Sequence, residues 1–451
     1  MSFNRLGSVL SFIAVLVLFA PRNSVLAGEG DLDPSFGTGG KLSADITGQL
    51  LDDAVGDVAL LPDGRILVAG TTSSGFPSEH DVAVVVFEPD GSLDESFGQG
   101  GRVLIDRGGN EFCDAVVVQP DGRVLLGGYR TTLPDGPPES LVFRLNPDGV
   151  LDTTFGNQEA FEPVLSFAVV DLALLPDGAI AAAGSRPSPS GSDFAIARLT
   201  SSGILDNEFG MGGVVILDFG ADDYLTQLSI DPDGRLVAAG LNTAGGLEVS
   251  RLLPDGSPDL SFFGAGQGVV DLTCFYDVST VIQQDGKMVV GTATGGAGLS
   301  NFLLARFNPD GSLDAGFGTD GVVTGDLTGT DDYLTCVTLQ PDGKILAVGW
   351  AGFYPDFLVQ RYHPDGSVDL SFGLGGWVHT DFIGDKDRAR AAIIQTNGQF
   401  LLAGDVPGSD VDESRDFGLA RYEITTVRQQ AEVRVNRSAR ARSGRRVNSI
   451  R

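Results

Sequence analysis

Residue types that commonly carry chemistry are scarce in this chain of 451 residues. Its three cysteines, Cys113, Cys274 and Cys336, are too few and too scattered for a disulfide framework or a zinc knuckle. Its three histidines form neither an H-x-H nor an H-E-x-x-H pattern, so the common zinc motifs are absent. The sequence also lacks a G-x-S-x-G nucleophile elbow. We therefore assign no catalytic residue, and the sequence indicates an architecture rather than a reaction.

Basic residues are also in short supply. Thirty Lys and Arg face 60 Asp and Glu, which gives a formal charge of −30. A body of this charge repels phosphate backbones, so we expect no nucleic-acid binding by the main fold. Outside residues 1–27, no segment has the apolar period of about 3.6 residues that is typical of a helix. With 42% hydrophobic residues and 63 glycines, the chain instead indicates a sizeable core and many tight turns, as in an all-β protein.

The first residues differ in composition from those that follow. A basic residue, a 12-residue apolar run at 9–20 and small residues before Gly28 predict a secretory signal peptide at residues 1–27. An uncleaved membrane anchor is the alternative, although the apolar run is short for a span. We expect a mature chain in the periplasm or outside the cell, monomeric and without a membrane span after cleavage.

The last residues, 424–451, reverse the charge of the chain. They hold eight arginines and one acid, whereas residues 28–423 hold 20 basic and 59 acidic residues. Such a run predicts a solvated, disordered tail. The alternative is contact with an anionic surface or polymer, or with the acidic body of the chain itself.

Residues 28–423 consist of one unit that is repeated seven times. A segment of the form Leu-Asp-x-Ser-Phe-Gly recurs every 53 to 61 residues, with its acid at Asp33, Asp94, Asp152, Asp206, Asp259, Asp314 and Asp369. Between these segments lies an Asp-Gly or Asn-Gly pair flanked by apolar runs, at positions 63, 121, 177, 233, 285, 342 and 397. Such pairs tolerate positive φ and are a strong hairpin signal.

Each unit is predicted to hold four short strands. Strand a precedes the Asp-Gly pair, strand b follows it, strand c ends in a recurring Arg, and strand d follows Phe-Gly. Seven units of this kind predict an all-β fold, namely a seven-bladed β-propeller of four-stranded antiparallel blades. We expect the recurring Phe to pack between neighbouring blades and the recurring Arg to pair with a nearby Asp.

The strands at the two ends of the propeller segment predict a closed ring. The propeller segment begins with a d strand at 39–45 and ends with a c strand at 416–423. Each of them alone would leave an unpaired sheet edge. We therefore expect the N-terminal strand to pair with the last blade and to close the ring. An open or miscounted ring is the alternative, but an open array usually ends in polar capping repeats, which the sequence lacks.

Three blocks carry a family resemblance. The blocks Pro-Asp-Gly-Arg-Ile-Leu-Val-Ala-Gly (62–70), Ser-Phe-Gly-x-Gly-Gly (96–101) and Phe-Asn-Pro-Asp-Gly-Ser-Leu-Asp (307–314) resemble the delta-60 repeat family of bacterial secreted and surface proteins. The resemblance covers nearly all of residues 31–423. It implies a propeller-like fold, often within larger surface proteins, and no common catalytic motif that would transfer functional residues. The strand order is also similar to that of NHL-type propellers, in which an N-terminal strand closes the last blade.

One face of the predicted ring varies more than the other. The a–b and c–d turns are tight, whereas the b–c and d–a connections differ in length, and binding usually resides in such variable loops. Aromatic candidates for a ligand contact gather on this variable face: Tyr129, Trp350, Phe353 and Tyr354.

A recurring acid begins strand a in most units. Ten residues before the hairpin Asp or Asn stand Asp53, Glu111, Asp223, Asp332 and Asp387. If strand a is innermost, we expect these five carboxylates to ring the channel mouth and to bind Ca²⁺ or a basic or polyhydroxylated ligand. The alternative is that each carboxylate caps its own strand end. No other cofactor is expected.

These observations leave three functions open. The first is a secreted or cell-surface propeller that binds a protein or polysaccharide through its variable face without catalysis. The second is a hydrolase or lyase, with or without a metal, that uses acidic residues at the channel mouth. The third is a structural component of the cell envelope.

Overall fold

The computed structural model describes residues 28–47, 52–75, 79–132, 138–156, 165, 167–189, 191–274, 277–294, 299–352, 355–382, 387–409 and 412–424. The predicted signal peptide and nearly all of the arginine-rich tail lie outside these residues. The described residues form strands, turns and bends and no helix, so this part of the chain offers no helix that could cross a membrane.

The strands follow one another along the chain without interruption by other elements. In order they are β1 (Lys41–Ala44), β2 (Asp53–Leu60), β3 (Ile66–Gly75), β4 (Glu79–Phe87), β5 (Arg102–Ile105), β6 (Asn110–Val118), β7 (Val124–Thr131), β8 (Glu139–Leu145), β9 (Ala168–Leu174), β10 (Ile180–Ser188), β11 (Gly191–Leu199), β12 (Val214–Leu217), β13 (Asp223–Ile230), β14 (Leu236–Asn242), β15 (Gly246–Leu252), β16 (Gln267–Asp271), β17 (Ser279–Ile282), β18 (Met288–Ala293), β19 (Phe302–Phe307), β20 (Val322–Gly325), β21 (Asp332–Leu339), β22 (Ile345–Ala351), β23 (Asp356–Tyr362), β24 (Trp377–Thr380), β25 (Arg388–Ile394), β26 (Phe400–Ser409) and β27 (Asp412–Tyr422).

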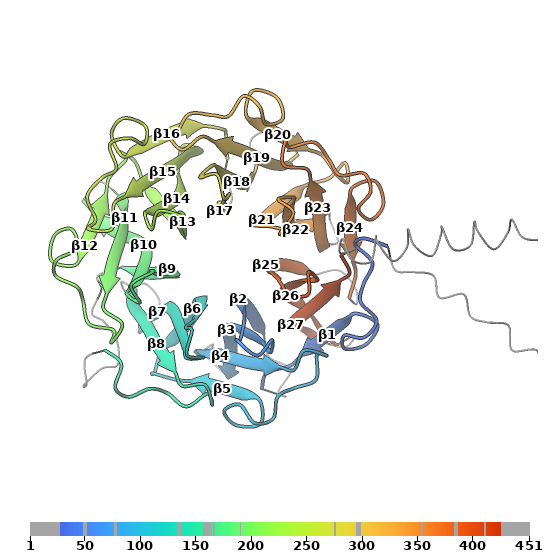
Figure 1. The fold of residues 1–451 in the computed structure, drawn as a ribbon. Helices are drawn as coiled ribbons and strands as arrows, with labels where there is room; N and C mark the ends of the chain where they lie inside the picture. Colours follow the sequence, from blue (N-terminus) through green and yellow to red (C-terminus); the bar gives the residue numbers. More distant parts are fainter. Residues whose placement is uncertain are drawn as a thin grey trace, which may run out of the picture.

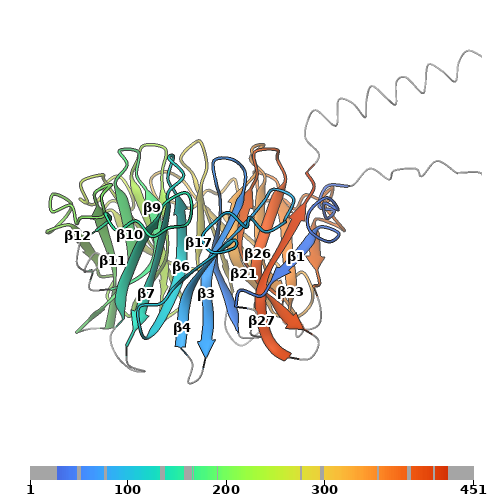
Figure 2. The same cartoon turned by 90° about the horizontal axis from the view of Figure 1, so that it is seen from below.

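These strands form antiparallel sheets around a central axis (Figure 1). The four-stranded sheets are β1-β27-β26-β25, β12-β11-β10-β9, β13-β14-β15-β16, β17-β18-β19-β20 and β21-β22-β23-β24. A larger sheet joins β2-β3-β4, with β5 beside β4, to β6-β7-β8 through a single parallel bridge between His80 and Asn110. Figure 2 shows the strands running along the axis, with the connections gathered at its two ends. The fold is all-β and is built of four-stranded antiparallel units, as predicted.

The predicted hairpins join the first two strands of each unit. In the first unit, the N–H of Leu61 donates to the carbonyl of Arg65, and the N–H of Gly64 donates to the carbonyl of Leu61. Gly64 has a φ of 91°, a value that favours glycine over residues with a side chain. The first strand of each unit lies nearest the axis, as Figure 1 shows for β2, β6, β9, β13, β17, β21 and β25.

Most of these inner strands carry a β-bulge where they pair with the second strand of their unit. The register shifts between Val55 and Asp57 in β2, and the same shift recurs in β6, β9, β13, β21 and β25. A bulge leaves one residue out of the ladder and bends the strand, which can re-aim a side chain. The bulges therefore determine which residues face the axis.

The recurring motif forms a contact that we call the outer staple, made of one Arg, one Asp and one Phe in each unit. The Phe side chains are at most 2% exposed and are Phe36, Phe97, Phe155, Phe209, Phe262, Phe317 and Phe372. The ion pairs are Arg144–Asp152, Arg198–Asp206, Arg251–Asp259, Arg306–Asp314, Arg361–Asp369 and Arg421–Asp33. The guanidinium also covers the Phe ring, for example Arg361 at 4.6 Å from the centroid of Phe372. The predicted roles of the Arg and the Phe are confirmed.

The first copy departs from this pattern in an instructive way. It has Val86 where the other units have Arg, and Arg65 from the start of β3 pairs with Asp94 instead. The equivalent residue after the hairpin also reaches the staple Asp in other units, as with Lys344 and Asp369 at 3.1 Å. A basic side chain from either strand can therefore neutralise the same buried carboxylate.

The first and last described segments belong to one unit. β1 pairs antiparallel with β27, in the register Lys41 to Ala420 through Ala44 to Phe417. The N–H of Glu423 donates to the carbonyl of Asp31 at 2.8 Å. Figure 1 shows β1 and β27 side by side. Asp33, the acid of the first Leu-Asp-x-Ser-Phe-Gly segment, thus forms an ion pair with Arg421 of the last strand.

Candidate functional site

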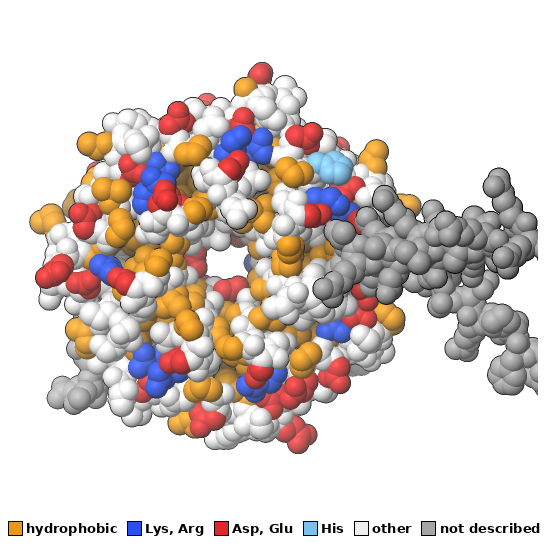
Figure 3. All heavy atoms as spheres, in the orientation of Figure 1, with side chains coloured by type: hydrophobic (Ala, Val, Ile, Leu, Met, Phe, Trp, Pro, Cys, Tyr) orange, Lys and Arg blue, Asp and Glu red, His pale blue; other side chains and the backbone are white. Residues whose placement is uncertain are grey.

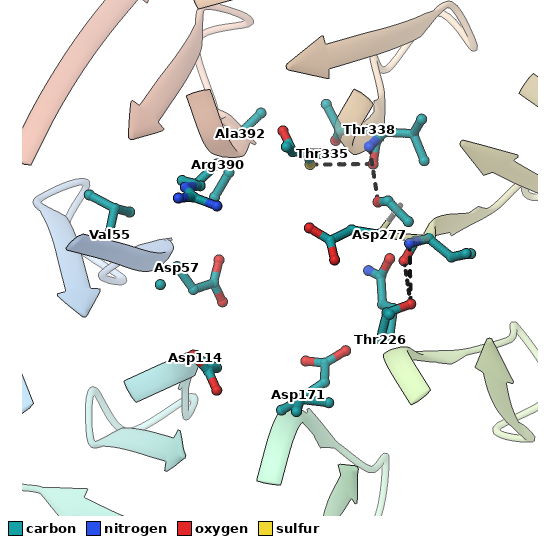
Figure 4. Close-up of a pocket in the computed structure, with 18 of the residues that line it drawn as sticks. Val55, Asp57, Asp114, Asp171, Thr226, Asp277, Thr335, Thr338, Arg390 and Ala392 are labelled. Atoms are coloured by element: carbon teal, nitrogen blue, oxygen red, sulfur yellow. Dashed lines mark hydrogen bonds between the residues drawn. The ribbon is translucent and has the colours of Figure 1, made fainter. Parts of the chain in front are cut away.

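The inner strands enclose a central cavity of about 570 Å³ (Figure 4). Residues from β2, β6, β9, β13, β21 and β25 line it, together with residues 277–279, which lead into β17. Pockets for small ligands usually measure about 300–1,000 Å³, so the cavity is large enough for one. Figure 3 shows the central opening on one face of the ring, with acidic side chains on its inner wall.

The bulges place polar side chains in this cavity. The residue left out of the ladder is Asp114 in β6, Thr226 in β13, Thr335 in β21 and Arg390 in β25, and each of them lines the cavity. Figure 4 shows these side chains around the cavity. A bulge is therefore the local device by which an otherwise apolar inner strand presents a polar group to the axis.

Four carboxylates and one guanidinium set the charge of the cavity. Burial raises the pKa of Asp57 to about 6, and burial together with the charge of Asp277 raises the pKa of Asp114 to about 6. Burial also raises the pKa of Asp171 to about 7, and the charge of Asp57 adds to the effect. Carboxyl groups whose charges are poorly solvated and repel one another hold protons at higher pH than free ones do. The cavity is therefore acidic and partly protonated near neutral pH.

The one guanidinium in the cavity has a fixed partner. The Nε and Nη2 atoms of Arg390 donate to Oδ2 of Asp405 at 3.0 and 2.9 Å. Asp405 is fully buried on β26, and its other oxygen accepts the N–H of Val55. The charge of Arg390 is thus balanced within the protein, which leaves the cavity with a net attraction for cationic groups.

Several cavity side chains also join neighbouring inner strands. Asp57 accepts the N–H of Val116 at 3.1 Å, and Asp171 accepts the N–H of Leu228 at 2.7 Å. Ser279 Oγ likewise accepts a backbone N–H of β21 at 3.0 Å. Within the described part of the chain, no hydrogen bond engages the carboxylates of Asp114 and Asp277. These two carboxylates are therefore the ones best placed to meet a ligand.

The cysteine that lines the cavity is not a nucleophile. Burial raises the pKa of the Cys336 thiol to about 12, so it is protonated at neutral pH. Reactive cysteines need the opposite shift, from a nearby cation or a helix end. Burial raises the pKa of Cys113 and Cys274 as well, and neither lines the cavity.

The five acids predicted at the channel mouth lie elsewhere. Asp53, Glu111, Asp223, Asp332 and Asp387 are all 0% exposed, and none of them lines the cavity. One oxygen of each accepts a backbone N–H from the preceding connection, as Asp53 does from Ile46 at 2.9 Å. The expected ring of carboxylates around the channel mouth is therefore not formed, and each acid instead holds the backbone of the connection that precedes its strand. Ligand binding by these residues stays a prediction.

The residue that follows each of these acids is less buried than the acid itself. Side chains alternate along a strand, so the residue after each acid faces the opposite way. These residues are Ala54, Phe112, Tyr224, Tyr333 and Arg388. Tyr224, for example, is 43% exposed although Asp223 is fully buried. Three of these five less buried residues are aromatic.

Two of the predicted aromatic residues stack on this set. Trp350 lies 4.0 Å from Tyr333 between ring centroids, and the guanidinium of Arg388 lies 4.8 Å from the Trp350 ring. We call Tyr333, Trp350 and Arg388 the mouth cluster. Tyr129 stacks on Phe112 at 4.9 Å in another unit. The remaining two aromatic candidates, Phe353 and Tyr354, lie outside the described residues.

The mouth cluster spans two neighbouring units. Tyr333 and Trp350 come from the start of β21 and the end of β22, and Arg388 begins β25. Inner strands start, and second strands end, at the side of the ring that carries the variable connections. The Nε atom of Arg388 is buried and has no hydrogen-bond partner among the described residues. An unsatisfied donor beside half-buried aromatic rings is a feature typical of binding sites.

Comparison with known families finds six matching segments between residues 61 and 372. A family described as "Domain of unknown function (DUF5122) beta-propeller" matches residues 61–97, 119–155, 175–209, 232–262, 283–317 and 340–372. These matches begin at the Asp-Gly hairpin and end at the Phe of the outer staple. The family's description gives no activity, and no curated protein matches the chain.

Comparison with solved structures finds matches at low sequence identity. A catalytically inactive virginiamycin B lyase from Staphylococcus aureus with quinupristin is 11% identical, covers 84% of this chain and 98% of its own, and has a TM-score of 0.45. The polysaccharide lyase Uly1 is 9% identical over 82% of this chain and 90% of its own, with a TM-score of 0.48. The calcium-binding protein regucalcin from Agrobacterium tumefaciens is 12% identical over 69% and 91%, with a TM-score of 0.38. Similarity at this level concerns the fold alone.

Proposed function

We propose, from the premise that this chain is a β-propeller repeat protein, that it is a secreted or cell-envelope binding protein. Its ligand would be a polysaccharide, held at the mouth cluster on the variable side of the ring, and no reaction would follow. A protein ligand that inserts a basic side chain into the central cavity is the second candidate.

We also propose that the ring has seven blades and is closed by β1 in the last one. The support comes from contacts that recur in every unit. Seven buried Phe residues mark seven outer staples, and β25-β26-β27 has the same hairpin as the other units. The pairing of β1 with β27 and the ion pair of Arg421 with Asp33 complete the last unit. A closed ring keeps the inner strands, and hence the mouth cluster, in a fixed arrangement.

The mouth cluster is the single observation that carries the polysaccharide proposal. Tyr333 and Trp350 offer stacked, half-buried rings, and such rings can cover the apolar face of a sugar. Arg388 holds a donor that no group of the described chain uses, and it can bond a sugar hydroxyl or carboxylate. Rigid aromatic side chains bind at a low cost in conformational entropy.

The central cavity supports the second candidate. Its carboxylates Asp114 and Asp277 carry no hydrogen bond from the described residues, and the cavity's one guanidinium is already paired. A lysine or arginine side chain of a partner protein would meet charge of opposite sign there.

The two tryptophans of the chain, Trp350 and Trp377, permit a direct test. In Trp377→Phe, Trp350 is the only tryptophan and reports on its own surroundings. We expect its fluorescence to change on titration with at least one polysaccharide of a broad panel. We expect Trp350→Ala to lose that binding by at least tenfold, as measured by calorimetry, while Trp377→Phe keeps it. Equal binding by Trp350→Ala and Trp377→Phe would contradict the proposal.

The same titration separates binding from catalysis. A lyase or hydrolase would need an acid or base in the cavity, and Asp114 is a candidate because it carries no hydrogen bond from the described residues and burial raises its pKa to about 6. We expect bound polysaccharide to keep its chain length during long incubation, as measured by size-exclusion chromatography. Shortening of the polymer that Asp114→Asn abolishes would establish an enzyme instead.

A further inference from the structure

Four groups of carboxylates lie at junctions between neighbouring units. Each group has three members, and one oxygen of each member lies within 4.8 Å of one oxygen of the other two. The groups are Asp45, Asp53 and Asp416; Asp81, Asp106 and Glu111; Asp193, Asp218 and Asp223; and Asp356, Asp381 and Asp387. We call them the junction carboxylates.

The composition of these groups follows one rule. One acid comes from the third strand of a unit, and one directly follows the fourth strand of that unit. The last acid begins, or lies directly before or after the start of, the inner strand of the next unit. In the first group these are Asp416 in β27, Asp45 after β1 and Asp53 in β2. Because the three acids come from the same strand positions at all four junctions, the group is a property of the repeat rather than a chance cluster.

The acid from the inner strand is incompletely satisfied in each group. It is 0% exposed, and one of its oxygens accepts a backbone N–H, at 2.9 Å from Ile46 in the case of Asp53. The other oxygen is buried and has no hydrogen-bond partner among the described residues. These orphan atoms are Asp53 Oδ1, Glu111 Oε1, Asp223 Oδ1 and Asp387 Oδ1. Buried polar atoms without partners are rare and point to an unseen partner.

A fifth junction provides a control within the same chain. Asp332 begins β21 in the same way and is also fully buried, but it belongs to no such group among the described residues. Directly before β19, the third strand of the preceding unit, stands Asn301 where the four groups have an Asp. Here the second oxygen is satisfied, because Asp332 Oδ1 accepts the hydroxyl of Thr328 at 2.8 Å. The orphan oxygen therefore occurs where three carboxylates meet and is absent where a carboxylate is missing.

Three carboxylates at such a distance repel one another unless a positive charge joins them. In the first group, burial, with the charges of Asp416 and Asp45 adding, raises the pKa of Asp53 to about 7. Ca²⁺ binds six to eight oxygens at about 2.3–2.6 Å, so ligand atoms across the ion stand up to about 4.6–5.2 Å apart. The spacing of the junction carboxylates is compatible with one ion in each group, and water or backbone carbonyls would supply its further ligands.

We propose that the junction carboxylates bind Ca²⁺, one ion in each of the four groups, and thereby tie neighbouring blades together. The inference is independent of the proposed ligand, since none of these residues lines the central cavity or belongs to the mouth cluster. It assigns Ca²⁺ to the spaces between units rather than to the channel mouth.

Calcium titration of the mature chain tests this assignment. Calorimetry of protein stripped with a chelator should give four sites, and Ca²⁺ should raise the melting temperature. Asp53→Asn keeps an oxygen that can accept the N–H of Ile46 and should reduce the count to three. Asp416→Asn, which changes a different member of the same group, should do the same. Asp332→Asn is the matched control and should keep four sites.

Two results would overturn the proposal. One is a chelator-stripped chain that takes up no Ca²⁺ and melts at the same temperature with and without it. The other is a number of bound ions that stays the same in Asp53→Asn and Asp416→Asn when both variants are folded by circular dichroism. Because the titration contains no polysaccharide, failure here leaves the proposed ligand function standing, and failure of polysaccharide binding leaves the Ca²⁺ sites standing.

Discussion

The outer staples and the inner wall of the ring are built from the same repeat but obey opposite rules. In the staples the same three residue types recur, so that Arg361 with Asp369 and Phe372 has counterparts in most other units. On the inner wall equivalent positions hold different residues, such as Asp114, Thr226 and Arg390 at the bulges. Repetition is found where the residues hold the units together, and variation is found where they face the axis.

The difference extends to electrostatics. In the staples, the hydrogen bond from Lys287 and the other partners of Asp314 lower the pKa of that carboxyl to about 2. On the inner wall, burial raises the pKa of Asp57 to about 6 and that of Asp171 to about 7. A staple carboxylate is therefore stabilised in its charged form by an ion pair. On the inner wall the charged form is destabilised by burial, and binding a proton or a cationic ligand would remove that penalty.

The largest effect should come from removing the strand that completes the last unit. Deletion of residues 28–45 removes β1 and Asp33, which exposes the edge of β27 and leaves Arg421 without its carboxylate. We expect aggregation or a large loss of thermal stability, measured by light scattering and calorimetry. A deleted chain that stays monomeric with an unchanged melting temperature would contradict ring closure and the comparison built on it.

The next largest effect should come from a single staple. Arg361→Ala leaves Asp369 buried without its main cation, and loss of one partner of a buried pair costs about 3–5 kcal/mol. Denaturant unfolding should show that loss. Thr335→Ala on the inner wall is the comparison variant and should cost about 1 kcal/mol, because it removes one hydrogen bond to the carbonyl of Ala389. Equal losses would erase the distinction between the two regions.

The pH dependence of stability should have opposite signs in the two regions. Asp171 has a folded pKa of about 7, above its unfolded value of about 4, so its contribution is present at low pH and is lost as pH rises toward 7. Asp314 has a folded pKa of about 2, so its contribution is present above about pH 4 and is lost as pH falls toward 2.

Two substitutions should separate these contributions. Asp171→Asn should flatten the decline in unfolding free energy between about pH 4 and 7, by about 1–2 kcal/mol after allowance for solvent. Asp314→Asn should flatten the opposite slope below about pH 4 and leave the upper range unchanged. Thermal unfolding in a pH series measures both, and a common direction of change in the two variants would refute the assignment.

The smallest effect should come from an exposed charge pair at the edge of a staple, where Arg123 also lies 3.9 Å from Asp152 but Arg144 remains that acid's main cation. Arg123 pairs with Asp121 at a hairpin turn, with side chains 40% and 52% exposed. Exposed pairs contribute about 0–1 kcal/mol, so Arg123→Ala should change stability by less than about 1 kcal/mol. A loss as large as that of Arg361→Ala would show that the hairpin side matters more than the staples do.

The repeated part of the molecule was predictable from the sequence, and the inner wall was not. Period and turn residues located the hairpins, and the recurrence of Arg, Asp and Phe indicated that these residues serve the unit rather than a site. Val86 stands where the other units have Arg. The sequence could not show that Arg65 takes over the ion pair with Asp94, because Arg65 precedes β3 and meets Asp94 only once β3 pairs with β4.

The candidate site escaped prediction because of strand alternation and bulges. Asp53 was placed at the channel mouth, but its side chain is fully buried at a junction between units, whereas the next residue, Ala54, is exposed. A bulge then adds one residue, so the count from Asp53 to Asp57 no longer gives the face of the strand. Isolated polar residues in otherwise apolar inner strands, such as Asp114 and Arg390, were the signal that could have found the cavity.

The most direct test of the account compares Trp350→Ala with Arg361→Ala in two assays on the same samples. One assay is the free energy of unfolding, and the other is affinity for the polysaccharide found with the Trp377→Phe reporter. The account predicts that Trp350→Ala loses affinity and keeps most of its stability, whereas Arg361→Ala loses stability and keeps its affinity at temperatures where it is folded. Loss of both properties together in each variant would contradict the division between a repeated frame and a variable binding wall.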